Sequence, residues 1–145
     1  MAGEITVVTK GFQEVDVFFK ETEKRMRNVE PALKQGAVLM LSSIERNFQE
    51  SGRPRRWRRL ASSTLKYKIR KGWSPLPLIR TGLLKNSMAV RTDSAKLVIG
   101  TAVPYAPFHQ FGTQHIPKRQ FLLFQNEDIK NINRLVKEHI TNAGR

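Results

Sequence analysis

The sequence predicts an α+β domain in which a small, mostly antiparallel sheet packs with N-terminal helices and a C-terminal helix. Three observations predict it: a long apolar stripe at helical spacing, two short β-branched runs joined by a turn signal, and a second amphipathic stripe near the C-terminal end. The 145 residues are most simply one domain spanning residues 1–145, and a 39% apolar composition is enough for a core.

A strand and a helix are expected first. Residues 5–9, ITVVT, are β-branched and short, which predicts a strand that ends before Gly11. Apolar residues then recur at helical spacing at Phe12, Val15, Phe19, Met26 and Val29. This spacing predicts a first helix that ends near Asn28.

The strongest periodic signal in the chain follows. Apolar residues at steps of four and three fall on one helical face at Leu33, Ala37, Leu41, Ile44 and Phe48. Pro31 is well placed in the first turn of such a helix, and Ser51-Gly52 would end it. The sequence therefore predicts a second N-terminal helix over this range.

The net charge of +14 is the most extreme property of the chain, and it is unevenly distributed. No Asp or Glu occurs between Glu50 and Asp93, whereas residues 51–92 contain twelve basic residues. Residues 52–76, here named the basic excursion, are interpreted as a long loop containing a short helix capped at Ser62 or Ser63. Nine like charges repel one another within it, so we expect the excursion to be mobile in an isolated subunit and ordered by assembly.

Such a charge distribution favours a polyanion or an acidic protein as partner. Arginine neutralises phosphate and aromatic rings can stack on bases, which makes nucleic-acid contact physically reasonable. The alternative is a solvated face whose aromatic residues only anchor the loop to the core, and charge alone leaves both open. The candidate DNA or partner contacts are Arg53, Arg55, Arg56, Trp57, Arg58, Arg59, Lys66, Lys68, Arg70 and Lys71.

The C-terminal half predicts a helix, a hairpin and a final helix. Thr81 could cap a short helix over residues 82–87, and residues 88–92 and 96–100 flank a turn as a β-hairpin does. An amphipathic C-terminal helix, followed by Gly144, is marked by Ile129, Ile132, Leu135, Val136 and Ile140.

The segment between hairpin and final helix, residues 105–124, reads YAPFHQFGTQHIPKRQFLLF. Pro104 and Pro107 would force the chain out of the sheet, and residues 106–111 can form a helical turn that packs Tyr105, Phe108 and Phe111 against the sheet. Gly112 would supply a left-handed exit, and Pro117 would start an extended return from Phe121 to Phe124. His109 and Gln110 are interpreted as hydrogen-bonding groups that fix this turn or a subunit contact.

Enzymatic and metal-binding classes are disfavoured. There is no cysteine, no Gly-x-Ser-x-Gly pattern and no acid between Asp93 and Glu127, and His109 and His115 lie six apart rather than four. We therefore expect no catalytic residue, no metal ligand and no cofactor. The start of the chain lacks the pattern of a signal peptide and no apolar run could span a bilayer, so cytoplasmic synthesis without membrane association is expected.

Two motifs carry a resemblance to a known family. They are Arg80-Thr81-Gly82-x-Leu84-x-x-Ser87 and Tyr105-Ala106-x-x-His109-Gln110-Phe111-Gly112-Thr113, followed by Pro117, Arg119 and Phe121. Their order over about residues 50–125 resembles the phage virion morphogenesis family, the tail-completion proteins of Mu-like phages and their relatives. Gln120 stands where a second proline is common, which affects the expected local turn.

The resemblance implies a structural role, with motif residues that shape the domain: Thr81, Gly82, Leu84, Ser87, Tyr105, His109, Gln110, Phe111, Gly112, Pro117, Arg119 and Phe121. It implies a virion protein that acts at the head–tail junction or the tail end. Related connector and tail-terminator proteins form rings, often of six subunits, so self-association and contact with adjoining connector or tail proteins are expected. The alternative function is a basic protein that binds nucleic acid without sequence specificity.

Overall fold

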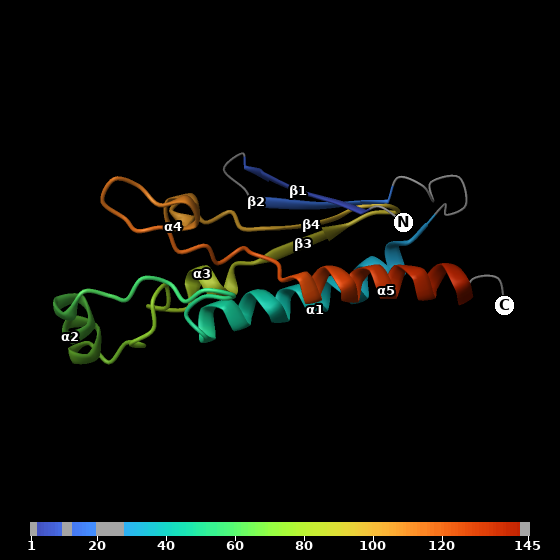
Figure 1. Cartoon of the computed structure of the whole chain (residues 1–145). Helices are drawn as coiled ribbons and strands as arrows, with labels where there is room; N and C mark the ends of the chain where they lie inside the picture. Colours follow the sequence, from blue (N-terminus) through green and yellow to red (C-terminus); the bar gives the residue numbers. More distant parts are fainter. Residues whose placement is uncertain (1–2, 10–12, 20–27, 143–145) are drawn as a thin grey trace.

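The computed structural model describes residues 3–9, 13–19 and 28–142, and its elements form two layers (Figure 1). The long helices α1 (Glu30–Gln49) and α5 (Asn126–Asn142) lie side by side in one layer, and the strands form the other. This arrangement confirms the predicted α+β class.

The described strands form two antiparallel pairs. β1 (Gly3–Thr9) pairs with β2 (Gln13–Phe19), and β3 (Ala89–Thr92) pairs with β4 (Leu97–Gly100). β2 lies beside β4, so the two pairs share one layer without forming a single hydrogen-bonded sheet among the described residues (Figure 1). The strand over residues 5–9 and the hairpin are confirmed.

The first predicted helix is wrong where the structure describes it, because residues 13–19 are strand β2. Val15, Val17 and Phe19 alternate with Glu14 and Asp16, a period of two that fits a strand as well as the same residues fit a helical period. β-branched valines and a partner strand three residues away favour the strand. Phe12 and Met26 of that prediction lie outside the described residues.

Helix α1 is confirmed in its position, its buried face and its end. Pro31 occupies the first turn, where its missing N–H costs nothing. Of the five stripe residues, four are buried, and Leu41 packs half-buried at the edge of the core. The helix ends before Ser51 and Gly52, whose φ angles of 55° and 101° are incompatible with its continuation.

The core lies between α1, α5, the strands and the extended segment that precedes α5. α1 and α5 approach closely at Gly36, where a Cβ atom would lie 3.1 Å from Ile132 Cγ1. The largest fully buried apolar side chains are Phe48, Phe121, Leu33, Met40, Ile44, Leu97, Ile99, Leu122 and Ile132.

Three short helices gather at one end of the molecule: α2 (Ser62–Arg70), α3 (Leu83–Asn86) and α4 (Ala106–Phe111) (Figure 1). All three were expected at these places. The expected serine cap of α2 is wrong, because the residue at the N-cap is Ala61 and no side chain bonds to the helix start.

The expected packing of the α4 aromatic residues against the sheet is also wrong. Tyr105, Phe108 and Phe111 are exposed, whereas Ala106 and Gln110 are buried. Residues four apart share one helical face, so burying 106 and 110 turns Phe108 and Phe111 toward solvent. The inward face of α4 is thus used for a polar side chain.

Truncations along α1 test the packing of the long helices. Ile44→Ala should cost about 2–5 kcal/mol of unfolding free energy, because Ile44 is 1% exposed and leaves a cavity. Leu41→Ala should cost less, and Val38→Ala, at 67% exposure, almost nothing. Urea unfolding measures all three, and equal effects of the Ile44 and Val38 changes would contradict the assigned face.

Candidate functional site

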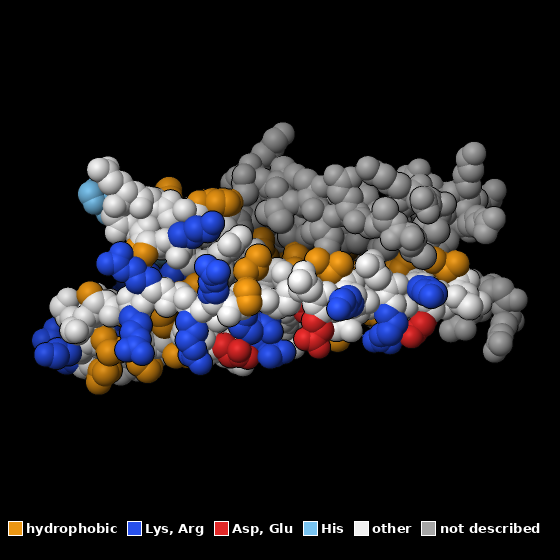
Figure 2. Space-filling view, viewed as in Figure 1, with side chains coloured by type: hydrophobic (Ala, Val, Ile, Leu, Met, Phe, Trp, Pro, Cys, Tyr) orange, Lys and Arg blue, Asp and Glu red, His pale blue; other side chains and the backbone are white. Residues whose placement is uncertain are grey.

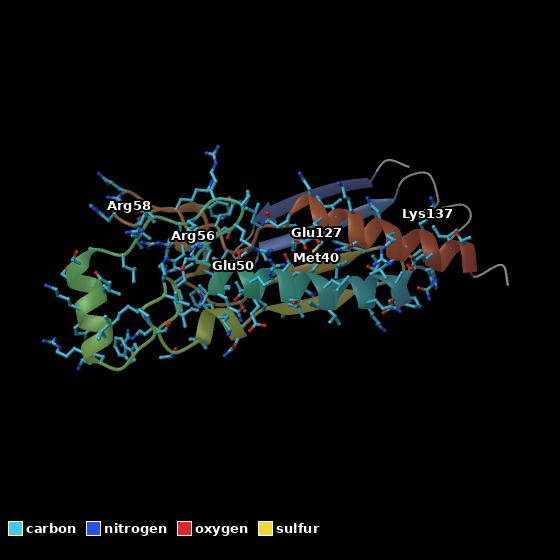
Figure 3. The ribbon with its side chains drawn as sticks, turned by 60° about the horizontal axis from the view of Figure 1, so that its bottom comes forward. Met40, Glu50, Arg56, Arg58, Glu127 and Lys137 are labelled. Carbon is cyan, nitrogen blue, oxygen red and sulfur yellow. The ribbon has the colours of Figure 1, made fainter. Side chains whose placement is uncertain are left out.

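The exposed arginines of the basic excursion gather at one end of the domain. Arg55, Arg56, Arg58 and Arg59 are exposed, as are Lys66, Arg70 and Lys71 on and just after α2. Lys and Arg side chains predominate over this end, whereas the acids visible in the same view lie along the helix layer (Figure 2). Arg56 and Arg58 lie at the opposite end of the molecule from Lys137 (Figure 3). Seven of the ten candidate contact residues are therefore accessible to a partner.

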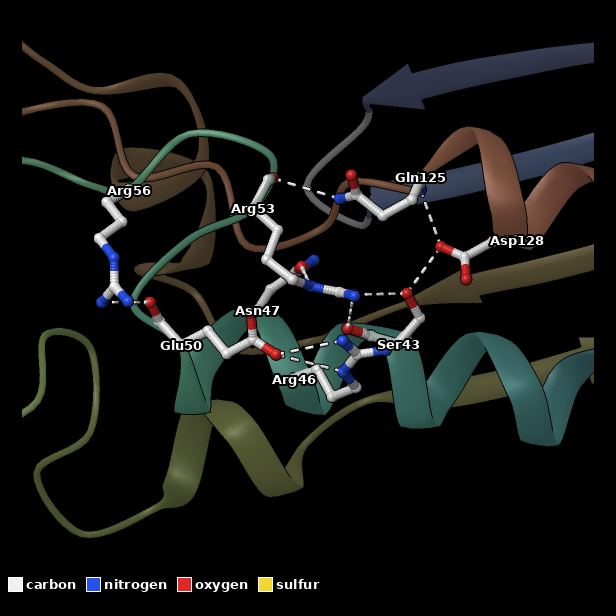
Figure 4. A network of polar contacts seen from close by, with 8 residues as sticks. All are labelled: Ser43, Arg46, Asn47, Glu50, Arg53, Arg56, Gln125 and Asp128. Atoms are coloured by element: carbon white, nitrogen blue, oxygen red, sulfur yellow. Dashed lines mark hydrogen bonds and ion pairs between the residues drawn. The ribbon is translucent and has the colours of Figure 1, made fainter.

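Arg53 has an internal position instead. Its Nη2 donates to Ser43 O and to Ser43 Oγ, each at 2.7 Å, and its Nε donates to Asn47 Oδ1 at 2.9 Å (Figure 4). The guanidinium thus fastens the loop after α1 to residues 43 and 47, near the C-terminal end of that helix, where the helix dipole favours a cation. Arg53 therefore supports the fold, and the exposed arginines that follow it are better placed to contact a partner.

The same network reaches the start of α5. Ser43 Oγ donates to Asp128 Oδ2 at 2.6 Å, and Gln125 N donates to the same oxygen at 2.7 Å. Asp128 lies in the first turn of α5 and accepts from the backbone N–H of Gln125, the residue before the helix. This contact is one half of a capping box. Gln125 Nε2 returns to Arg53 O at 3.2 Å, so α1, the excursion and α5 are joined (Figure 4).

Residues 57–59 of the excursion are held by residues 119 and 120. Arg119, 7% exposed, donates from Nε to Arg58 O at 3.1 Å and from Nη2 to Arg59 O at 3.4 Å. Trp57 Nε1 donates to Gln120 O at 3.2 Å, and its ring meets Phe48 edge-on with centroids 6.0 Å apart. Trp57 is therefore an anchor of the loop, and its ring is turned into the protein rather than toward bases.

The segment that supplies these contacts is itself held by Gln110. Gln110, 1% exposed, accepts from Phe121 N at 3.1 Å and Leu122 N at 3.0 Å, and its Nε2 donates to Leu122 O at 2.9 Å. Gly112 permits the turn, since its φ is 73° and a Cβ atom would lie 2.9 Å from Lys118 N. These contacts agree with the interpretation of Gln110 as a hydrogen-bonding group that fixes this turn. The same interpretation of the His109 side chain is not supported at its buried Nδ1, which has no hydrogen-bond partner.

Lys68 closes the second part of the excursion. Its Nζ donates to Leu76 O at 2.5 Å and to Ile79 O at 2.9 Å, and the residue is 8% exposed. Burial, and secondarily the charge of Arg119, lower the pKa of Lys68. Lys68 therefore joins α2 to the chain that returns from it. The expected mobility of residues 52–76 in an isolated subunit stays a prediction for amide hydrogen exchange.

The remaining aromatic residues of this region lie next to cations. Arg80 stacks over Trp73 with 4.1 Å between Cζ and the ring centroid, and Arg70 lies 5.5 Å from the centroid of Tyr67. Tyr67 and Trp73 themselves meet edge-on at 5.7 Å. These rings stabilise the excursion, so phosphate or carboxylate contact by the exposed arginines is better supported than base stacking.

The first motif shapes the junction between excursion and sheet. Leu84 is buried in the core, and Gly82, with φ of 83°, precedes α3. Ser87 Oγ donates to Leu84 O and shares a second bond with Thr101 Oγ1, each 2.7 Å. The Thr81 hydroxyl accepts only a long bond, 3.4 Å, from Leu83 N.

The second motif shapes the turn after α4 and the segment that follows it. Phe121 is fully buried and lies 5.5 Å from Phe48 between ring centroids. His109 contributes its carbonyl, which accepts from Arg119 N at 2.8 Å. Pro117 lies half-buried in the turn before this return.

The side chain of His109 is the least satisfied polar group of the described region. Its Nδ1 is buried without a hydrogen-bond partner, and the ring packs edge-on against Tyr105 at 5.9 Å. Burial, and then the charge of Arg119, lower the pKa of His109. Within the part of the chain that the structure describes, no three His, Cys, Asp or Glu side chains are grouped as metal ligands.

A family model matches most of the chain. The model of the phage virion morphogenesis family matches residues 11–141. The chain belongs to the phage virion morphogenesis family. Membership supports a structural role in phage virion assembly. The matched range includes both motifs and the entire basic excursion.

One relative carries a descriptive name. The chain is 29% identical over 135 residues to "Mu-like prophage FluMu G protein 2" of Haemophilus influenzae, covering 88% of this chain and 90% of that protein. No solved structure gave a significant match. Among the described residues, none of the helices combines the length and apolar character needed to cross a membrane.

Three residues of the site were missed by the sequence analysis: Ser43, Asn47 and Asp128. A signal for two of them exists, because Ser43 and Asn47 are polar, four apart, and adjacent to the apolar positions Ile44 and Phe48. Polar residues beside a buried stripe need partners, which predicts a buried network there. Their partners come from residues 53 and 121–128, which spacing could not show.

Gln110→Met tests the anchor of the return segment. Methionine keeps the approximate size but leaves Phe121 N, Leu122 N and Leu122 O without their partner. Each buried group left unpaired costs about 1–3 kcal/mol, so we expect a loss above about 3 kcal/mol. Gln49→Met, at an exposed position on α1, is the matched control; equal unfolding midpoints of the two variants would contradict the role.

The His109 ring should titrate below the usual value of about 6.5. Because folding depresses this pKa, stability is complete above the unfolded-state pKa and falls as the pH drops through it toward the folded-state value. NMR titration of the ring measures the pKa directly, with His109→Gln to assign the resonance. That variant should lose less stability than the parent between pH 7 and pH 5; a ring pKa at or above 6.5 would refute the burial argument.

Proposed function

We propose that this protein is a ring-forming subunit that acts at the head–tail junction or the tail end of a phage virion. In the assembled ring, the exposed arginines of the basic excursion face the DNA passage or an acidic surface of the adjoining virion ring. Both partners would offset the same charge, and both contacts should weaken with salt.

The single observation that carries the proposal is the display of Arg55, Arg56, Arg58 and Arg59 on a fastened loop. Their side chains are exposed, while the backbone beneath them is held by Arg119 and Trp57. A purely solvated loop does not need this internal fastening. Family membership supplies the context of virion assembly.

Self-association is supported by the exposed aromatic residues of α4. Tyr105, Phe108 and Phe111 are 39%, 52% and 48% exposed; the first is the N-cap of α4 and the other two lie on that helix. Large exposed aromatic groups are typical of protein interfaces. A ring of six is the arrangement that we favour, by resemblance to related connector proteins.

The second candidate function is that of a free-standing protein that binds nucleic acid without sequence specificity. The exposed cations favour it, since phosphate contacts carry no sequence information. The inward position of Trp57 argues against base stacking as its mechanism. Light scattering after size-exclusion chromatography separates the two, because a monomer that binds DNA tightly would favour the second.

Replacing Arg55, Arg56, Arg58 and Arg59 with serine tests the proposal. We expect unchanged oligomer mass and loss of infectious particle completion, because the four side chains make few contacts within the subunit. If binding to generic duplex DNA also falls, the arginines face the DNA passage; if DNA binding is unchanged, they face a protein.

The matched control removes four cations elsewhere. Replacing Lys34, Lys130, Arg134 and Lys137, which are exposed on α1 and α5, lowers the net charge of +14 by the same amount. This variant should still complete particles. Normal particle completion by the excursion variant would show that the loop is only a solvated face.

A further inference from the structure

A groove of about 610 Å³ lies between α2, the chain that returns from it, and α4. The volume is in the range of sites that bind small ligands or several side chains. Its walls are mostly apolar and aromatic: Leu60, Tyr67, Trp73, Leu78, Ile79, Leu83, Leu84 and Tyr105. Tyr67 and Leu83 are 44% and 58% exposed, so apolar surface is left uncovered at its rim.

The charged groups in this groove are all basic. Lys68, Arg80 and Arg119 line it together with the imidazole of His109, and its lining as described contains no carboxylate. Lys68 and Arg119 are bonded to backbone carbonyl groups, which orient them without neutralising their charge. Arg119 Nη1 is the guanidinium nitrogen that none of these bonds uses. An apolar groove with fixed cations concentrates positive potential where water is scarce.

We propose that this groove binds a segment of an acidic partner protein in which a carboxylate side chain is flanked by apolar residues. The apolar neighbours would cover Leu83 and Tyr67, and the carboxylate would approach the basic side chains. This goes beyond the proposed ring and its arginine loop, because it assigns a second surface and the chemistry of its occupant.

Charge complementarity decides between this occupant and two others. A second copy of the chain cannot fill the groove with its own basic end, because residues 51–92 contain no Asp or Glu to meet the cations. Nucleic acid would satisfy the cations, but its sugar–phosphate backbone would leave the apolar walls uncovered. An acidic segment with apolar neighbours matches both properties of the groove.

Selection from a random display library of twelve-residue peptides tests the inference. It is performed on the full chain and on the variant with serine at 55, 56, 58 and 59, because exposed arginines would attract acidic peptides by themselves. Peptides enriched on both proteins should carry Asp or Glu beside aliphatic or aromatic residues. Changing that acid to its amide should weaken binding at least about tenfold, as expected for a charge-assisted hydrogen bond.

Two groove variants locate the binding. Leu83→Ser should weaken the enriched peptides at least about fivefold, whereas Leu39→Ser, another exposed leucine, should not. Arg80→Gln should weaken them without the folding risk of replacing Lys68 or Arg119, and Lys137→Gln is its control.

The absence of enriched peptides would overturn the proposal. So would enriched peptides whose binding is unchanged by the amide change or by Leu83→Ser. An oligomer mass lowered by Leu83→Ser would also overturn it, in favour of a second copy. These readouts are independent of particle completion, so the two proposals can fail separately.

Discussion

The structure depends on how a buried, extended segment without a strand partner satisfies its backbone. Residues 119–125 run from the α4 turn to α5 and belong to none of the described strands, although Phe121 and Leu122 are buried. Unpaired backbone groups in such a place are costly, so side chains must replace the missing strand. Gln110 bonds to residues 121 and 122, and Asn47 Nδ2 donates to Phe121 O at 2.9 Å and to Leu123 O at 3.0 Å.

The same segment then holds the basic excursion. Arg119 bonds to the carbonyl groups of residues 58 and 59, Trp57 bonds to Gln120, and Gln125 bonds to Arg53 O. Positive residues that repel one another are therefore ordered by backbone carbonyl groups rather than by acids, which are absent from residues 51–92. This solution preserves the net charge of the loop, whereas ordering by carboxylates would cancel it.

The sequence predicted the elements whose signals are local. The α1 stripe is repeated over four turns, so its helix and buried face followed from spacing alone. Residues 13–19 were mispredicted because Val15 and Phe19 fit both a helical and an alternating period, and the pairing with β1 that decides between them is a tertiary property. Tyr105, Phe108 and Phe111 were expected inside because composition does not show that Gln110 uses the inward face of α4.

The sequence predicted the site as a cluster of basic residues. It did not show that some of these cations are buried and others exposed. Arg53, Lys68 and Arg119 are partly or largely buried and bonded to carbonyl groups, whereas Arg55 and Arg59 are exposed at the surface. A count of basic residues cannot separate them, since the separation comes from which backbone carbonyl groups lie within reach. The buried cations are required for the fold, because removing one would leave its carbonyl partners unpaired. The exposed cations repel one another and make few stabilising contacts in the isolated subunit. We therefore infer that they serve to meet an anionic surface in the assembled virion.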